Sequence, residues 1–194
     1  APGDLWTSPY PSAFHPTTFI ASQAADFIVA QTARQPWFTF CSFIAPHHPF
    51  EAPQDQIDRY DAASIPLPES RNGVDPSAIP QPIAAAIGEM DGFSEAVQRR
   101  IVHHYLASIS LIDDGVGRVM EALERSGQAD DTLILFTSDH GEFLGNHGLL
   151  RKPSLHYDEV LRVPLLLRLP GGALPPRRES GLVELADVMP TLLG

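Results

Sequence analysis

The residues with the clearest capacity for chemistry are Asp139 and His140, which follow an apolar run at residues 132–136. This run is partly β-branched and is typical of a strand that is buried on both faces of a parallel sheet. Such a strand ends at the carboxyl edge of the sheet, where open α/β folds place their ligands. A carboxylate and an imidazole at that edge can bind a divalent cation. The alternative is that Asp139 caps the next turn, at Gly141, and that His140 packs against it.

A second pair of imidazoles, His47 and His48, follows another apolar segment at residues 37–44 and stands between Pro46 and Pro49. Prolines stiffen the backbone and limit the directions in which the imidazoles can point. A histidine with a fixed direction suits the role of an acid, a base or an anion donor. Each histidine alone is more simply interpreted as a surface loop residue. However, both predicted strands, 37–44 and 132–138, are followed by histidine, which favours a shared site.

Lys152 lies thirteen positions after Asp139, in a loop that Gly145 and Gly148 allow to fold back. Its ammonium group could neutralise an oxyanion beside a bound cation. The alternative is a solvated charge on the surface. His147, in the same loop, is expected to make a helix or loop contact rather than to take part in catalysis.

Other residues of reactive type are expected to have structural roles. His103 and His104 occupy neighbouring positions of a long helical pattern and cannot both face one metal ion, so we interpret them as structural or exposed. Asp113 and Asp114 are expected to form a solvated edge. Cys41 lies in an apolar segment without an activating base nearby in the sequence, which predicts a small buried hydrophobe.

Helices and strands alternate along the chain. The predicted elements are a helix at 16–34 capped by Thr17 or Thr18, a strand at 37–44, a long helix that Ser94 begins and Gly127 ends, a strand at 132–138, a short helix at 154–160, a strand at 163–169, and a strand or short helix at 182–193. Residues 51–92 are rich in proline and are expected to form a long surface excursion that shapes a pocket, with a turn of helix near residues 54–60. This order predicts an α/β fold with a mostly parallel sheet sandwiched between helices.

The composition excludes several classes of protein. A formal net charge of -11 argues against a protein that follows nucleic-acid backbones or anionic membranes. No apolar run reaches the length of a membrane span. Cys41 is the only cysteine, so neither a disulfide framework nor a thiolate zinc cluster can form. The 194 residues, 43% of them hydrophobic, suffice for one domain with a sizeable core.

Several motifs stand in a fixed order along the chain. They are Pro46-His47-His48-Pro49-Phe50, Asp113 and Gly117 in the long helix, the run 131–141 ending in Ser138-Asp139-His140-Gly141, Leu144 to Gly148, Lys152, Arg162 to Leu165, and the run 185–191. Together they resemble the sulfatase family of the alkaline phosphatase-like superfamily over about residues 17–194. The Ser-Asp-His-Gly element is shared with phosphodiesterases and mutases of that superfamily. The lysine and the Pro-His-x-Pro-Phe element favour sulfatases or the similar phosphonate monoester hydrolases.

The resemblance implies a role for each candidate residue. Asp139 and His140 are implied to be metal ligands, with His140 at a position where many sulfatases have Asn. Lys152 is implied to hold a sulfate oxygen, and His47 to contact the sulfate or assist the departing alkoxide, which makes both catalytic and substrate-binding. The expected cofactor is one divalent cation, Ca²⁺ first, with Mg²⁺ or Mn²⁺ as alternatives because an imidazole is among the ligands. The expected partner is a small-molecule or carbohydrate sulfate ester.

Members of the family also carry an N-terminal pair of aspartates and a Cys-x-Pro-x-Arg or Ser-x-Pro-x-Arg segment whose first residue becomes formylglycine, the nucleophile. The 194 residues contain no such segment, and Cys41 is followed by Ser42-Phe43-Ile44-Ala45. We therefore expect the chain, residues 1–194, to be the central-to-C-terminal part of a sulfatase catalytic domain. Without the nucleophile it is expected to be inactive alone and to bind metal weakly at best.

The expected function of the parent protein is metal-dependent hydrolysis of sulfate esters. The first alternative is a phosphonate monoester or phosphodiester hydrolase, because the same donors suit both kinds of tetrahedral anion. The second is a non-catalytic binding module that retains the fold. A periplasmic or secreted location and a cytoplasmic one both stay open, as does the oligomeric state.

Overall fold

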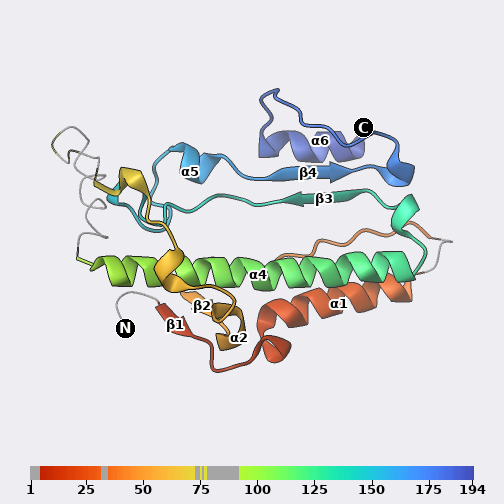
Figure 1. Ribbon diagram of the computed structural model, residues 1–194. Coiled ribbons are helices and arrows are strands. Elements are labelled where there is room, and N and C mark those ends of the chain that lie inside the picture. The colour runs from red at the N-terminus through yellow and green to blue at the C-terminus, as the bar shows by residue number, and fades with distance from the viewer. Residues whose placement is uncertain (1–4, 32–34, 73–74, 76, 78–91) are drawn as a thin grey trace.

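The computed structural model describes residues 5–31, 35–72, 75, 77 and 92–194. Helix α4 (Glu95–Arg125) is 31 residues long and runs through the molecule, with α1 (Pro16–Ala30) packed along its C-terminal part (Figure 1). The two helices approach closely at Gly115, where a Cβ atom would lie 3.2 Å from that of Ala21. Small residues at this contact let the backbones come together, and α4 becomes the axis against which the other elements pack.

Helix α1 begins two or three residues earlier than a threonine cap would place it. Its N-cap is His15, whose Nδ1 accepts a hydrogen bond from the backbone N–H of Thr17 at 3.2 Å. Pro16 occupies the first helical position, which suits proline because its missing N–H would lack an intrahelical partner anyway. The expectation of a cap at Thr17 or Thr18 is therefore wrong. The helix ends at Ala30, within the predicted range.

Both ends of α4 follow the sequence prediction. Ser94 is the N-cap, in an extended conformation. At the other end Gly127 has φ +72°, its N–H donates to Glu124 O at 3.0 Å, and the N–H of Gln128 donates to Leu123 O at 3.2 Å. These two bonds form a Schellman motif, which satisfies the last carbonyl groups and requires a left-handed residue that glycine adopts without strain.

Among the described residues, four short strands form two separate pairs on opposite sides of α4 (Figure 1). β1 (Leu5–Thr7) pairs in parallel with β2 (Phe50–Ala52). β3 (Ile134–Thr137) pairs in antiparallel orientation with β4 (Leu165–Arg168). Because α4 separates the pairs, the core consists of several small apolar clusters along this helix. One of them joins Leu5 and Phe50 to Ile101.

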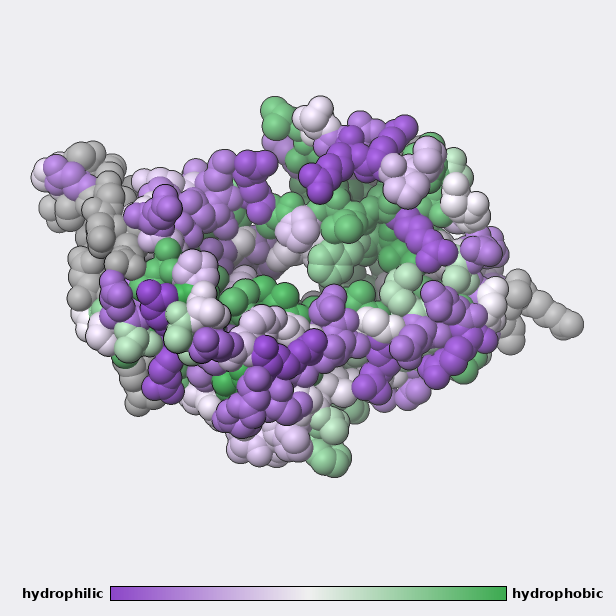
Figure 2. Space-filling model, viewed as in Figure 1, coloured by the Kyte–Doolittle hydropathy of each residue, from purple (hydrophilic) through white to green (hydrophobic). Residues whose placement is uncertain are grey.

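The direction and the burial of β4 differ from the prediction of a mostly parallel sheet with buried strands. The chain returns beside β3 in the opposite direction because the connection folds into a loop and the single-turn helix α5 (Asp158–Leu161), not into a crossover helix. Leu165, Leu166 and Leu167 are 41%, 60% and 47% exposed. Figure 2 shows the hydrophobic residues of this part of the surface gathered over β3 and β4. An apolar run in the sequence predicts that a strand will be buried. It does not predict which element covers the strand.

Residues 37–44 were expected to form a strand, and they are extended without strand pairing within the described part of the chain. Trp37 anchors the start of this segment, because its Nε1 donates to Oε1 of Gln128 at 2.8 Å and its ring meets that of Phe27 edge to face. Phe38 and Phe40 are 77% and 80% exposed. The apolar pattern predicted a strand, but a strand also needs a hydrogen-bonded neighbour, which this segment lacks among the described residues.

The segment 51–92 begins in the core and not on the surface. Ala52 and Ile57 are buried together with Ala107 of α4. Helix α2 (Gln54–Ile57) confirms the predicted turn of helix near residues 54–60. Residues 78–91 lie outside the described part of the chain, so the surface excursion there stays a prediction.

The C-terminal region contains more helix than strand. α5 lies at the end of the short helix predicted for 154–160, and α6 (Val188–Leu193) decides the choice for 182–193 in favour of a helix. No helix among the described residues is both long and apolar enough to cross a bilayer.

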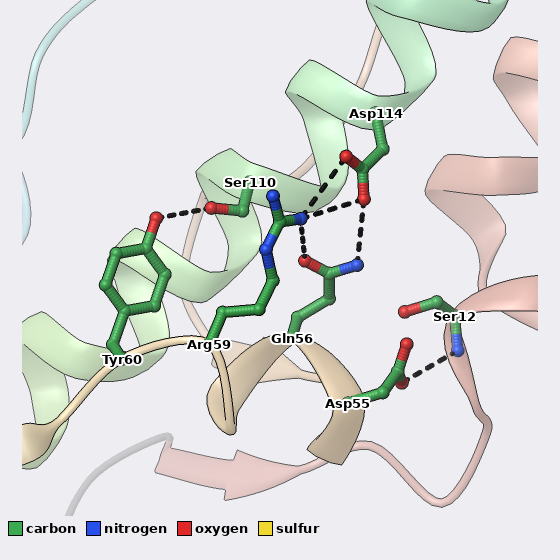
Figure 3. Close-up of polar contacts among 7 residues, drawn as sticks. All are labelled: Ser12, Asp55, Gln56, Arg59, Tyr60, Ser110 and Asp114. Carbon is green, nitrogen blue, oxygen red and sulfur yellow. Dashed lines mark hydrogen bonds and ion pairs between the residues drawn. The ribbon is translucent and has the colours of Figure 1, made fainter.

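Polar contacts hold α2 on α4, and they involve one residue of the expected solvated edge. Asp113 is exposed as predicted, but the carboxylate of Asp114 accepts from Gln56 Nε2 and from Arg59 Nη1, each at 3.0 Å (Figure 3). Tyr60 and Ser110 share a further hydrogen bond between their hydroxyl groups. The Arg59 and Asp114 side chains are 47% and 49% exposed, so their ion pair adds about 1 kcal/mol at most.

His103 and His104 are buried structural residues, which confirms one of the two alternatives given for them. His103 Nε2 donates to Ile57 O at 2.8 Å, and His104 Nδ1 donates to Arg100 O at 2.9 Å. The other ring nitrogen of His104, Nε2, is buried without a hydrogen-bond partner among the described residues. Burial lowers the pKa of His104 below its usual value of 6.5. A proton added at Nε2 would be a buried charge without an acceptor.

This buried imidazole predicts a loss of stability in acid. The pKa of His104 is lower in the folded than in the unfolded protein, so the unfolded chain takes up more protons as the pH falls through 6.5. Stability is therefore complete above that pH and decreases below it. We expect the urea midpoint of the complete protein to decrease when the pH is lowered from 7.5 to 5.5. The midpoint of the His104→Gln variant should decrease less. His156→Gln, at an exposed position, is the matched control and should behave as the unaltered protein does. An equal pH response of all three proteins would contradict this assignment.

Candidate active site

The end of β3 and the end of the extended segment 37–44 meet at one cleft of about 300 Å³. Its walls are residues 42–47 on one side and residues 138–142 on the other, and Tyr105 of α4 lies between them. A hollow of about 480 Å³ lies elsewhere, between α1 and the end of α4, but none of the described residues lining it is a histidine or a lysine. The smaller cleft is the one with converging reactive groups.

His47 reaches the cleft from the first of these segments. Its Nδ1 lies 2.6 Å from His48 O, and since a carbonyl only accepts, Nδ1 carries the proton and Nε2 keeps its lone pair. The ring stacks on that of His48 with centroids 4.1 Å apart, and it meets the ring of His140 at 6.2 Å. The end of the segment 37–44 and the end of β3 therefore converge, as the sequence suggested.

Asp139 and His140 follow β3 directly. Asp139 Oδ1 accepts the backbone N–H of His140 at 3.0 Å, which is the turn contact that the structural alternative predicts. His140 Nδ1 donates to Gly141 O at 2.8 Å, so Nε2 of this ring keeps its lone pair. The free carboxylate oxygen, Asp139 Oδ2, lies 3.6 Å from that Nε2. A hard cation holds ligands at about 2.4 Å, and two ligands at right angles around it lie about 3.4 Å apart.

The spacing of these two atoms therefore fits a shared divalent cation. The described part of the chain brings no third acidic, histidine or cysteine side chain within ligating reach of them. Ca²⁺ takes about six to eight ligands, so this pair alone would hold it weakly. The residues present fit one side of a metal site.

Lys152 folds back to the same place. Its ammonium group donates to His140 Nε2, and its side chain is partly buried, so the alternative of a fully solvated charge is wrong. This contact uses the lone pair that a cation would also use, so the ammonium and a cation compete for one atom of His140. A cation bound there leaves the ammonium free to face an anion in the cleft.

Sequence reasoning missed Glu142 and Tyr105 as residues of the cleft. Burial raises the pKa of the Glu142 carboxyl, and nearby backbone N–H groups and His140 oppose that rise. Burial, together with the charge of Glu142, raises the pKa of Tyr105 to about 12. A carboxylate immediately after the Asp-His-Gly turn was a usable signal for Glu142. Tyr105 gave none, because it follows the apolar pattern of the helix.

His147 and Cys41 have the non-catalytic roles expected of them, but Cys41 is less buried than predicted. His147 Nε2 lies 3.1 Å from Glu159 Oε1 of α5, so it makes the expected loop-to-helix contact. Cys41 is partly buried, not enclosed in a paired strand, and burial raises the pKa of its thiol. A raised pKa disfavours the thiolate, in agreement with the view that Cys41 is no nucleophile.

Comparison with known proteins finds similar sequences and similar structures. A family model for sulfatases matches residues 3–194. An arylsulfatase of Clostridium perfringens is 32% identical over 190 residues, which cover 95% of this chain and 39% of that relative. A choline-sulfatase of Rhizobium meliloti is 35% identical over 168 residues, which cover 82% of this chain and 31% of that relative. The solved phosphonate monoester hydrolase of Agrobacterium radiobacter superposes with a TM-score of 0.72 at 30% identity, over 88% of this chain and 36% of the other.

These relatives extend well beyond the matched region, since the chain spans 39% of the length of the arylsulfatase. The superposition confirms the predicted α/β class, because the matched structures have the alkaline phosphatase-like fold. The family model covers almost every residue of the printed sequence, including both strand exits and the loop that carries Lys152. The chain belongs to the sulfatase family, within the alkaline phosphatase-like superfamily.

Proposed function

We propose that the protein containing this chain hydrolyses sulfate esters with the help of one divalent cation. The observation that carries the proposal is the convergence of His47 and His140 on one cleft, with the Lys152 ammonium group on His140 Nε2 and the Asp139 carboxylate beside them. These residues come from two segments far apart in the sequence, and each has a group that can stabilise or move charge. The proposed substrate is a small-molecule or carbohydrate sulfate ester.

In this proposal the chain supplies ligands, an anion donor and an acid. Asp139 Oδ2 and His140 Nε2 would hold the cation, which when bound spreads the negative charge of the sulfuryl group. The hard carboxylate favours Ca²⁺, and Mg²⁺ or Mn²⁺ are the alternatives. Lys152 holds a sulfate oxygen and stabilises the charge that develops on it.

His47 is the proposed acid for the departing oxygen. Its Nδ1 is occupied by the carbonyl of His48 at 2.6 Å, so Nε2 is the atom that can carry a proton toward the substrate. Stacking on His48 limits rotation of the ring, which lines the cleft. A positioned proton donor of this kind contributes about 10²- to 10⁴-fold to a rate.

A second candidate function is hydrolysis of phosphonate monoesters or phosphodiesters. The superposition on the phosphonate monoester hydrolase, at 30% identity, favours it directly. The donor set gives no preference, because a lysine, a histidine and a cation suit sulfuryl and phosphoryl groups alike. In either reaction the nucleophile is proposed to be a formylglycine in a segment outside these 194 residues.

The test is to express the complete reading frame together with a formylglycine-generating enzyme and to assay an aryl sulfate, an aryl phosphonate monoester and an aryl phosphodiester. Mass spectrometry of the modified peptide confirms that the nucleophile is present. Highest kcat/KM on the aryl sulfate, lost on chelation and restored by Ca²⁺, Mg²⁺ or Mn²⁺, supports the first proposal. Highest kcat/KM on a phosphorus ester supports the second. A correctly modified protein inactive on all three substrates would be a non-catalytic module.

A further inference from the structure

The loop between His140 and Lys152 is closed on itself by backbone hydrogen bonds. Phe143 N donates to Arg151 O at 3.1 Å, and Gly145 N donates to Leu149 O at 2.8 Å. The side chains of Phe143 and Leu149 are buried with that of Leu155, so the loop has a small core of its own. The closure of this loop sets where Lys152 emerges relative to His140.

Glu142 lies where the two arms of the loop meet. Its Oε1 accepts the backbone N–H of Leu144 at 3.3 Å, and the N–H groups of Phe143 and Arg151 also face its carboxylate. One side chain thus contacts the outgoing arm and the last residue before Lys152. A carboxylate that accepts a backbone N–H group is held in place, because charge-assisted hydrogen bonds are stronger than neutral ones.

A direct chemical role for Glu142 fits less well. Its oxygens point at the backbone of its own loop, and the side chain is largely buried. His47 and Lys152 already offer a proton donor and an anion donor at the cleft. The position of Glu142, between the metal-binding candidates and the lysine, suits a residue that fixes geometry.

We propose that Glu142 is a positioning residue, which clamps the loop 143–151 so that Lys152 points at a tetrahedral anion in the cleft. The inference rests on the proposed function, because it assigns the anion to Lys152. Glu142 then contributes to turnover through Lys152 and not by touching the substrate. Its effect must disappear when the lysine is absent.

A double-mutant cycle in the complete, modified protein tests this dependence. We expect Glu142→Ala to lower kcat/KM for an aryl sulfate by about 10- to 100-fold, as loss of a supporting hydrogen-bond partner commonly does. In a Lys152→Ala background, the same change should have an effect below about twofold. Glu142→Gln keeps one acceptor oxygen and should recover most of the activity. Glu121→Ala, an exposed glutamate on α4, is the control and should have no effect.

Sulfate binding separates this inference from the proposed function. Titration calorimetry measures the affinity of the same Glu142 and Lys152 variants for inorganic sulfate. These affinities give a second double-mutant cycle, which needs no turnover. If the unaltered protein hydrolyses none of the substrates, the proposed function fails, while the sulfate cycle still decides the role of Glu142. Equal effects of Glu142→Ala with and without Lys152, or no sulfate binding by the unaltered protein, would overturn the inference. Should Glu142→Ala fail to fold, Glu142→Asp, whose shorter side chain draws the carboxylate away from Leu144 N, carries the same cycle.

Discussion

Replacing Lys152 with alanine in the complete protein is expected to lower kcat for its best ester substrate by about 10²- to 10³-fold, the range seen when one preorganised oxyanion donor is removed. The ammonium group lies against His140 in a partly buried cleft, where charge is poorly screened. Most of its interaction with the anion develops as charge builds up on the sulfuryl oxygens, so KM should change less than kcat.

A matched control separates this effect from a general loss of positive charge. Arg162 is 80% exposed and pairs with Asp158 one helical turn earlier, so Arg162→Ala removes a nearby charge outside the cleft. It should keep kcat within about twofold, because exposed pairs of this kind contribute little. Full activity of Lys152→Ala, or an equal loss in both variants, would reject the anion role of Lys152.

Replacing Gly141 with alanine is expected to destabilise the protein by about 3 kcal/mol, the sum of an overpacking cost and a weakened backbone hydrogen bond. A Cβ atom at Gly141 would collide with the carbonyl oxygen of Glu159 in α5. Backbone cannot yield as a flexible side chain would, and the bond from Gly141 N to Val160 O, 2.8 Å long, would have to open. Activity should fall as well, because the turn between His140 and Glu142 would move.

Gly117 provides the control for this substitution. It lies within α4, and a Cβ atom there would have nothing within 4 Å. Alanine at an exposed helical position is favoured over glycine by about 0.5–1 kcal/mol, so Gly117→Ala should raise the unfolding free energy. Chemical denaturation of both variants measures the two changes. A Gly141→Ala protein as stable as the unaltered one would show that α5 does not pack on this turn as described.

Local signals in the sequence were enough to predict the long helix and to select residues that lie close together in the structure. Helix α4 begins after Ser94, which occupies the N-cap position without a side-chain cap hydrogen bond, and it ends at a left-handed glycine, Gly127. Both ends follow from short-range effects. The convergence of His47 with His140 followed from two apolar segments that each end in histidine. Lys152 reached the same cleft because the glycine-rich loop can turn back.

What escaped prediction depends on contacts between distant segments. The antiparallel pairing of β3 with β4 depends on the path of the connection, which hydrophobic periodicity does not encode. The cap of α1 came from His15, because Pro16 displaced the start of the helix from the threonines. Glu142 escaped notice because its importance comes from the backbone N–H groups around it and not from its spacing to other reactive residues.

We expect one tetrahedral anion to bind between two segments of this chain, and a crystal structure of the complete protein with tungstate can show whether it does. Tungstate is a tetrahedral dianion whose tungsten atom is located by anomalous scattering. The expected result is a single strong peak in the cleft, with oxygens in hydrogen-bond contact with Lys152 Nζ and His47 Nε2. A protein saturated with tungstate whose anomalous peak lies elsewhere, with Lys152 still bonded to His140, would contradict it.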